Sequence, residues 1–221
     1  MIKFKLHNNW TDDFIKIKSS LRVVQMVGAT RSKLRFYHNI RVSMYVSIIG
    51  SSLGMTEKQL RYLGLAGFMH DIGFVAINDC ILDKPAGLLP GEYQLIKSHP
   101  QIGMQILDLM RLPDDVIKAV TQHHECYNGE GYPLGLKGER ISLYGRILFL
   151  AETFDAMTND MPYRDACTID AAMSFIKNMS GKRFDPVLVD IVLNSEEISA
   201  FYYGKDRISS DSLFILSNLS R

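Results

Sequence analysis

The sequence predicts an all-α protein. Apolar residues recur at helical spacing along most of the 221-residue chain, the pattern of helices that bury one face. Proline, glycine and capping residues divide this pattern into segments of ordinary helix length. Strand-like alternation of apolar and polar residues is scarce, and only residues 201–216 weakly indicate a hairpin. We therefore expect helices packed around one core.

Local start and stop signals place the individual helices. Thr56, with Gln59 three residues later, forms a capping box, and Pro90 is a residue type favoured at the first position of a helix. Gly54 and Gly181 stand where helices are expected to end. The expected helices cover, in chain order, residues 11–27, 32–52, 56–73, 90–99 up to the interruption at Pro100, 113–125, 142–158, 168–179 and a last segment from 186.

The domain organisation follows from the same pattern. The loop 126–140 contains four glycines and Pro133, so it cannot form a regular helix or strand. There is no internal repeat and no low-complexity stretch. We expect one domain over residues 30–195, an N-terminal helical segment over 1–29 and a C-terminal appendage over 196–221.

The composition excludes several classes of protein. Hydrophobic residues make up 47% of the chain, which allows a sizeable core and argues against global disorder. The 25 basic and 24 acidic residues leave a net charge of +1. A protein that binds a nucleic-acid polymer normally shows a strong basic excess, so we expect no such partner.

The cysteines and the apolar stretches indicate a cytoplasmic protein. Cys80, Cys126 and Cys167 are far apart and form no closely spaced pair, which argues against a disulfide framework or a thiolate zinc site. The first ten residues lack the apolar run of a secretory signal. Residues 44–55 are apolar but too short and too serine-rich to span a bilayer, so we expect no membrane span.

Histidines in apolar surroundings are the main functional signal. A lone histidine on an apolar helix is usually a hydrogen-bonded core residue. Five such residues in one domain would each need a separate partner, because an unpaired buried imidazole is unfavourable. A shared metal centre would satisfy all five at once. These residues are His38, His70, His99, His123 and His124.

Two carboxylates strengthen the metal hypothesis. Asp71 follows His70 at an expected helix end, and Glu152 interrupts an otherwise apolar helix. A buried carboxylate needs a compensating positive charge, which a metal ion supplies. The alternatives are a helix-terminal role for Asp71 and, for Glu152, an ion pair with Arg146 or Arg164.

The number of candidate ligands favours two ions over one. Ligands of the histidine and carboxylate type suit iron, manganese or zinc. Seven side chains exceed what one tetrahedral zinc ion needs. Two ions bridged by a carboxylate would use them better, and such sites activate a bridging water to hydrolyse phosphate esters.

Several short motifs occur in an order that resembles the HD-GYP family, a bacterial branch of the HD-domain metal-dependent phosphohydrolases. The resemblance covers residues 31 to about 195. The matching segments are HNIRV (38–42), HDIG (70–73), HP (99–100) with Gly103, HHE (123–125), GEGYP (129–133), AETFDAMTNDMPYR (151–164), Gly181 and FDP (184–186).

The resemblance implies a helical bundle with a metal site in its core and hydrolysis of cyclic di-GMP or a related cyclic dinucleotide. It implies two divalent metal ions, with iron preferred and manganese or zinc as alternatives. One ion would use His38, His70, Asp71 and Glu152, and the other would use Asp71, His99, His123 and His124. Asp71 would bridge the ions and be the catalytic carboxylate. The substrate-binding rim would comprise Gly131, Tyr132 and Pro133, with Arg164 on a phosphate.

The chain departs from the family pattern at several positions. Phe74 stands where a phosphate-binding lysine is usual, and Met161 replaces the first arginine of the usual RPYR segment. Glu152 replaces an aspartate, and Leu34 stands where some members carry a glutamate for a third metal, so we expect two metals. Asp155, one turn after Glu152, is a candidate for orienting a ligand; an exposed polar residue is the alternative.

Three functional hypotheses follow. The first is a cyclic di-GMP phosphodiesterase in which a metal-bridging hydroxide attacks the phosphodiester. The second is a metal-containing regulatory or binding module with little turnover, motivated by Phe74 and Met161. The third retains hydrolysis but changes the nucleotide. The resemblance also allows a diguanylate cyclase domain as a protein partner and leaves a homodimer open.

Overall fold

The computed structural model describes residues 31–84, 87–160 and 165–204. The expected N-terminal helix and most of the tail lie outside these residues. The described part is helical and contains no strand, only an isolated bridge between Ser180 and Phe184, so the all-α prediction is confirmed. Its elements are α2 (Lys33–Ser52), α3 (Glu57–Met69), η1 (Ile72–Ala76), α4 (Asp79–Leu82), α5 (Pro90–Lys97), α6 (His99–Leu109), α7 (Asp114–Gln122), η2 (Gly138–Arg140), α8 (Leu143–Thr158), α9 (Ile169–Asn178), α10 (Pro186–Leu193) and α11 (Glu196–Gly204).

Side-chain caps define most helix starts where the sequence predicts them. The capping box of Thr56 and Gln59 is present at the start of α3. Ser32, Ser142 and Thr168 each accept a hydrogen bond from a backbone N–H in the first turn of α2, α8 and α9, respectively. These bonds satisfy amide donors that have no partner inside the helix.

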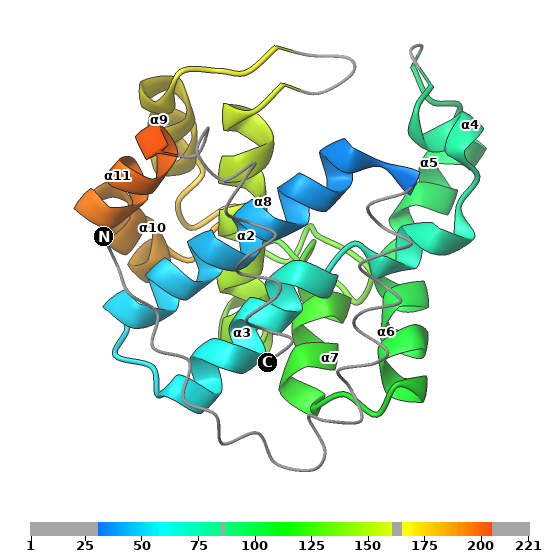
Figure 1. The fold of residues 1–221 in the computed structure, drawn as a ribbon, viewed down its shortest axis with the longest axis horizontal. Coiled ribbons are helices and arrows are strands. Elements are labelled where there is room, and N and C mark those ends of the chain that lie inside the picture. The colour runs from blue at the N-terminus through cyan, green and yellow to red at the C-terminus, as the bar shows by residue number, and fades with distance from the viewer. Residues whose placement is uncertain (1–30, 85–86, 161–164, 205–221) are drawn as a thin grey trace.

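Helices α2, α3, α7 and α8 form the centre of the bundle. Helix α2 packs against α3 and α8, and α7 contacts α3, α6 and α8. Helices α9, α10 and α11 gather on one side of the molecule, and α4, α5 and α6 lie on the opposite side (Figure 1). The core between them is apolar and closely packed, and its fully buried members include Val42, Val46, Leu63, Ile147 and Leu148. No helix in the described ranges has the length and apolarity needed to cross a membrane.

The helix expected over residues 56–73 ends earlier, at Met69, and continues as the 3₁₀ turn η1. A close approach between η1 and α6 accounts for this change. A Cβ atom on Gly73 would lie only 1.9 Å from the carbonyl oxygen of His99, so only glycine fits there. The short helix α4 was not expected from the sequence.

Helix α11 corrects the weak hairpin indication in the tail. Residues 201–204 belong to this helix, and the remainder of 201–216 lies outside the described residues. Ile198 is buried, and the ring of Phe201 packs edge-on against Tyr45 of α2 with centroids 4.8 Å apart. These contacts outweigh a weak local pattern. The domain boundary near residue 195 stays a prediction, with α11 packed on the bundle just beyond it.

The contact between α2 and α3 generates a stability prediction. A Cβ on Gly67 would lie 2.8 Å from the Cα of Ser43, whereas the nearest atom to one on Gly64 would be the Ser47 hydroxyl at 3.4 Å. We expect Gly67→Ala to lower the free energy of unfolding by about 2 kcal/mol through overpacking. The matched variant Gly64→Ala should raise it by up to about 1 kcal/mol, because alanine favours the helix. Urea denaturation measures both; equal effects would contradict the close packing.

Candidate metal centre

Three of the five candidate histidines follow the C-terminal turn of a helix. The last carbonyl groups of a helix have no partner within it. In each case the ring Nδ1–H donates to the carbonyl three residues earlier. The bonds are His70 to Gly67 (2.8 Å), His99 to Ile96 (2.7 Å) and His123 to Val120 (2.6 Å).

These hydrogen bonds determine which nitrogen of each ring is available. A carbonyl oxygen only accepts, so Nδ1 must carry the proton. In the neutral imidazole Nε2 then presents a lone pair, the usual form of a histidine that ligates a metal. The ends of α3, α5 and α7 therefore turn three basic nitrogens toward one region. The partial negative charge at these helix ends also favours a cation there.

The fourth histidine, His38 of α2, is oriented by a carboxylate instead. Its Nδ1 lies 2.7 Å from Oδ2 of Asp155 on α8. Arg41 donates two hydrogen bonds to the same carboxylate, at 2.7 and 2.9 Å. Asp155 is fully buried, so the alternative of an exposed polar residue is wrong. A carboxylate that orients a histidine in this way is a common feature of metal sites.

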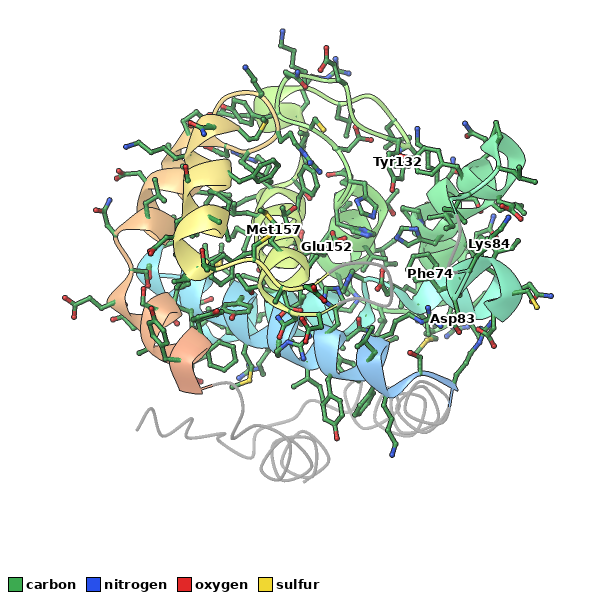
Figure 2. All side chains as sticks on the ribbon, turned by 90° about the horizontal axis from the view of Figure 1, so that it is seen from above. Phe74, Asp83, Lys84, Tyr132, Glu152 and Met157 are labelled. Carbon is green, nitrogen blue, oxygen red and sulfur yellow. The ribbon has the colours of Figure 1, made fainter. Side chains whose placement is uncertain are left out.

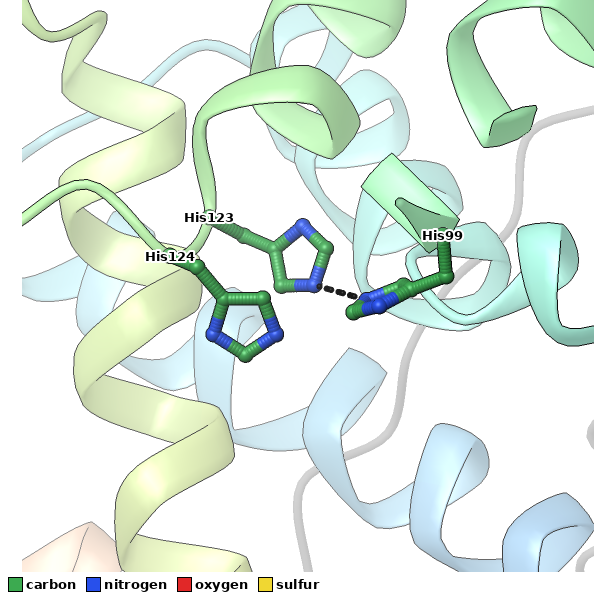
Figure 3. A group of neighbouring side chains, drawn as sticks. All are labelled: His99, His123 and His124. Carbon is green, nitrogen blue, oxygen red and sulfur yellow. Dashed lines mark hydrogen bonds between the residues drawn. The ribbon is translucent and has the colours of Figure 1, made fainter. Parts of the chain in front are cut away.

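The five rings converge on one region between the helices. Adjacent ring centroids lie between 4.1 and 5.3 Å apart. Figure 3 shows three of these rings facing one another. Among the described residues, two groups have ligand atoms close enough to hold a metal ion: His38, His70 and Asp71, and His99, His123 and His124.

One contact within this cluster fits a cation better than a hydrogen bond. The Nε2 atoms of His99 and His123 lie 3.0 Å apart (Figure 3). Since both rings donate through Nδ1, their neutral forms direct two lone pairs at each other. A proton between them would require one ring to be charged, but burial lowers the pKa of both. A metal ion would remove this conflict.

Asp71 links the two groups. Its Oδ1 lies 3.4 Å from Nε2 of His70 and 3.6 Å from Nε2 of His99. Burial alone would raise the pKa of Asp71, but the neighbouring imidazoles of His70, His99 and His38 hold it below its ordinary value. The carboxylate therefore stays ionised between the two groups of histidines.

Glu152 of α8 completes the cluster. Its Oε1 lies 3.8 Å from Nε2 of His124, and its Oε2 is buried without a hydrogen-bond partner in the part of the chain that the structure describes. Burial, followed by repulsion from Asp71, raises the pKa of Glu152 well above its ordinary value. The alternative of an ion pair with Arg146 is wrong, because Arg146 pairs with Asp185.

The donor set therefore fits metal ions. Within residues 31–84, 87–160 and 165–204, the Nε2 of His70 and the Oε2 of Glu152 are both buried without a hydrogen-bond partner. Unpaired buried polar atoms destabilise a fold unless something compensates them. Imidazole and carboxylate ligands without thiolate are those of iron, manganese and zinc.

The glycine-rich loop forms one wall beside the cluster. The ring of Tyr132 stacks on His124 at 4.8 Å, and its backbone N–H donates to the His124 carbonyl. Gly131 approaches the chain so closely that a Cβ would lie 2.1 Å from the amide nitrogen of Cys126. Pro133 follows through a cis peptide bond. Arg164, the remaining candidate for substrate binding, lies outside the described residues.

Sequence reasoning missed the residue that anchors this loop. Glu125 is buried, and its carboxylate accepts hydrogen bonds from the backbone N–H groups of Leu134 and Leu136. The sequence shows Glu125 directly after the histidine pair. It does not show that the carboxylate bonds to backbone groups nine and eleven residues later. Lys97, whose Nζ lies 4.7 Å from the centroid of Tyr132, was also missed.

Phe74 lies directly against the cluster. Its ring stacks on His99 with centroids 4.1 Å apart and an angle of 28° between the planes. Glu152, Tyr132 and Phe74 come from three different elements and surround one region of the molecule (Figure 2). An apolar ring therefore occupies the position where the resemblance leads one to expect a lysine.

Comparison with known proteins identifies the family. The profile of the HD domain matches residues 21–188. The chain belongs to the HD domain family. It is 38% identical over 155 residues to the cyclic di-GMP phosphodiesterase response regulator RpfG of Xanthomonas campestris, covering 69% of this chain and 41% of that protein. It is 33% identical over 189 residues to a cyclic di-GMP phosphodiesterase of Thermotoga maritima, covering 85% and 51%. The resemblance to the HD-GYP branch is confirmed.

Solved structures agree on the fold. A cyclic GMP-AMP-specific phosphodiesterase of Vibrio cholerae aligns with a TM-score of 0.57 at 22% identity, covering 86% of this chain and 53% of that one. The predicted HD-domain helical bundle is confirmed. The chain spans about half the length, or less, of the curated relatives named above.

The first prediction from the site concerns metal content. His124→Ala removes one ligand from the group with His99 and His123, so bound divalent metal should fall by about half or more. Lys118→Ala, an exposed change on α7, is the control and should retain the metal. Elemental analysis of each purified protein gives the metal-to-protein ratio. An unchanged ratio in His124→Ala would show that this residue is not a ligand.

The second prediction concerns pH. Burial lowers the pKa of His70 to about 4, and lowers those of His99, His123 and His124 as well. The unfolded chain therefore binds protons near pH 6.5 that the folded metal-free protein does not. Stability from these groups is complete above about pH 6.5 and is lost as the pH falls toward 4. Glu152 has a raised pKa, so its own contribution to stability increases as the pH falls. It is one group against four histidines.

Urea denaturation of chelator-treated protein between pH 7.5 and 5 tests this sign. The urea concentration at the midpoint of unfolding should decrease as the pH is lowered. The decrease should be smaller in His123→Asn, which lacks one of the four rings. A midpoint that stays constant or rises on acidification would show that the rings are not buried in neutral form.

Proposed function

We propose that this chain is a metal-dependent phosphodiesterase that hydrolyses cyclic di-GMP. The observation that carries the proposal is the convergence of five imidazoles with Asp71 and Glu152 in a member of the HD domain family. The relatives named cyclic di-GMP phosphodiesterases support the choice of substrate. The similarity to a cyclic GMP-AMP-specific enzyme supports the fold alone.

The proposed ligand sets extend the two groups of side chains: Asp71 is added to the second group, and Glu152, which lies 3.8 Å from His124, is added to the first. One divalent ion would bind His38, His70, Asp71 and Glu152, and the other would bind Asp71, His99, His123 and His124. The position of Asp71 between His70 and His99 supports a bridging role. Leu34, in place of a third-metal glutamate, supports two ions. Iron is preferred, with manganese or zinc as alternatives.

The bound ions would supply Lewis acidity and a water ionised near neutral pH. The protein's own contribution is orientation. Asp155 and three backbone carbonyls fix four imidazoles before any ligand binds, which limits reorganisation during the reaction. Tyr132 covers His124 and shields that side of the centre from water. Gly131, Tyr132 and Pro133 would form the substrate-binding rim, and Arg164 would meet a phosphate.

Three expectations stay predictions: a cytoplasmic location, contact with a diguanylate cyclase domain and a homodimer. They depend on surfaces and partners that are not part of the cluster.

Turnover by metal-loaded protein tests the proposal. We expect conversion of cyclic di-GMP to pGpG or GMP, measured by chromatography. Asp71→Asn should lower kcat by about 100-fold or more, because it removes the charge between the two groups. Asp108→Asn, an exposed change on α6, is the control and should retain activity.

The metal content of the same samples decides how a negative result is interpreted. Intact cyclic di-GMP in a sample with two ions per chain would contradict the proposal and favour the binding-module alternative. Cleavage of a different nucleotide alone would favour an altered substrate.

A further inference from the structure

A pocket adjoins the metal cluster between α2 and η1. Its lining includes Asp71, which places one end of the pocket directly beside the proposed ligands. Its apolar walls include three aromatic rings, from α2, α3 and η1: Phe36, Phe68 and Phe74. The pocket therefore offers flat apolar surfaces next to the reaction centre.

Two polar residues of α2 line the same pocket and have unsatisfied atoms. Nη2 of Arg35 and Oδ1 of Asn39 are buried and have no hydrogen-bond partner among the described residues. The two residues are four positions apart on one helix, so their side chains lie on the same face. Buried polar atoms are normally hydrogen-bonded, so these two exceptions call for a partner such as a water molecule, an ion or a ligand. One of these atoms is a donor and the other is an acceptor.

Arg35 is anchored even though this atom is unpaired. Its Nη1 lies 3.2 Å from Oδ1 of Asp83, while Oδ1 of Asp79 is 3.7 Å from Nη2, beyond hydrogen-bond distance. Arg31 binds Asp79 and donates to the carbonyls of η1, which holds α4 against α2. Asp83 and Phe74 lie on the same side of the molecule (Figure 2). The guanidinium is thus held beside the pocket, and the two N–H groups of Nη2 can donate to a ligand.

The chemistry of the pocket selects among ligands. A phosphate group has only acceptors, so it would pair with Arg35 but leave the Asn39 oxygen unsatisfied. A water molecule would satisfy polar atoms but not the aromatic walls. A purine base has a flat apolar face and carries acceptors and donors on its edge. Guanine offers O6 and N7 to an arginine and its N–H groups to an amide oxygen.

We infer that this pocket holds one guanine base of the substrate, with Arg35 and Asn39 as specificity-determining residues. The base would lie against Phe74, in the position where a lysine is otherwise expected. This inference rests on the proposed function for the identity of the nucleotide. It makes the pocket a site for base recognition, separate from the metals that act on phosphate.

Calorimetry with GMP and AMP on the metal-loaded full chain tests this inference. GMP contains the base but no cyclic phosphodiester, so its binding is measured without turnover. The protein should bind GMP about fivefold or more tightly than AMP. Asn39→Leu should weaken GMP binding about tenfold and leave AMP binding within about twofold. Arg35→Lys, which keeps the charge but loses Nη2, should also weaken GMP binding.

The stability of Asn39→Leu provides a second readout. Because the variant removes an unpaired buried oxygen, its urea midpoint should be equal to or higher than that of the parent protein. A lower midpoint with unchanged GMP affinity would indicate a purely structural role and overturn the inference. Asp83→Asn, which loosens Arg35 but keeps Nη2, is the control and should retain most of the preference for GMP.

The outcomes separate this inference from the proposed function. GMP binding that depends on Asn39, without any turnover of cyclic di-GMP, would support the pocket and contradict the enzyme. Normal turnover with GMP binding that is unaffected by Asn39→Leu and Arg35→Lys would overturn the pocket and leave the enzyme. Inorganic phosphate that binds as tightly as GMP would also overturn it.

Discussion

The structure depends on how its buried imidazoles are compensated. Three backbone carbonyls and Asp155 accept hydrogen bonds from Nδ1 of four imidazole rings. The Nε2 atoms of these rings therefore point toward the cluster. The interior then contains facing lone pairs and two carboxyl groups, and these repel one another without a positive charge. Protonation is a poor remedy, because burial disfavours charged imidazole. Divalent cations bound by these residues would remove the repulsion and would also supply Lewis acidity.

Several helices of the bundle end at the histidine cluster. Short helices such as α5 and α7 expose last-turn carbonyls at the cluster, and each carbonyl orients the ring that follows. Close backbone approaches keep these ends together: Gly73 allows η1 to reach His99, and Gly131 brings the loop back onto the end of α7. The glycines of the motifs therefore act through packing, because a side chain at either position would separate the elements that carry the ligands.

Features of the fold and of the site that depend on neighbouring residues could be predicted from the sequence. Capping residues and prolines predicted the starts of α2, α3, α5, α8, α9 and α10, and the count of histidines in apolar surroundings predicted the cluster. Distant partners were beyond this reasoning. The bonds from Asp155 to His38 and Arg41 join positions more than 110 residues apart, and α11 is stabilised by a ring contact with Tyr45. The sequence named Asp155 as a candidate for orienting a ligand, but only the folded arrangement shows which ring it orients.

The replacement of a lysine by Phe74 shows how one position connects the cluster to the pocket. A lysine beside His99 would place an ammonium group close to the proposed cations, where its charge would oppose them unless phosphate lay between. A phenylalanine has no such conflict, and its stacking on His99 helps to hold that ring. In the proposed base site, this change would remove a charge that binds phosphate and would add a surface that stacks on a flat base. Recognition would then move from the phosphates, which all cyclic dinucleotides share, to the bases, in which they differ.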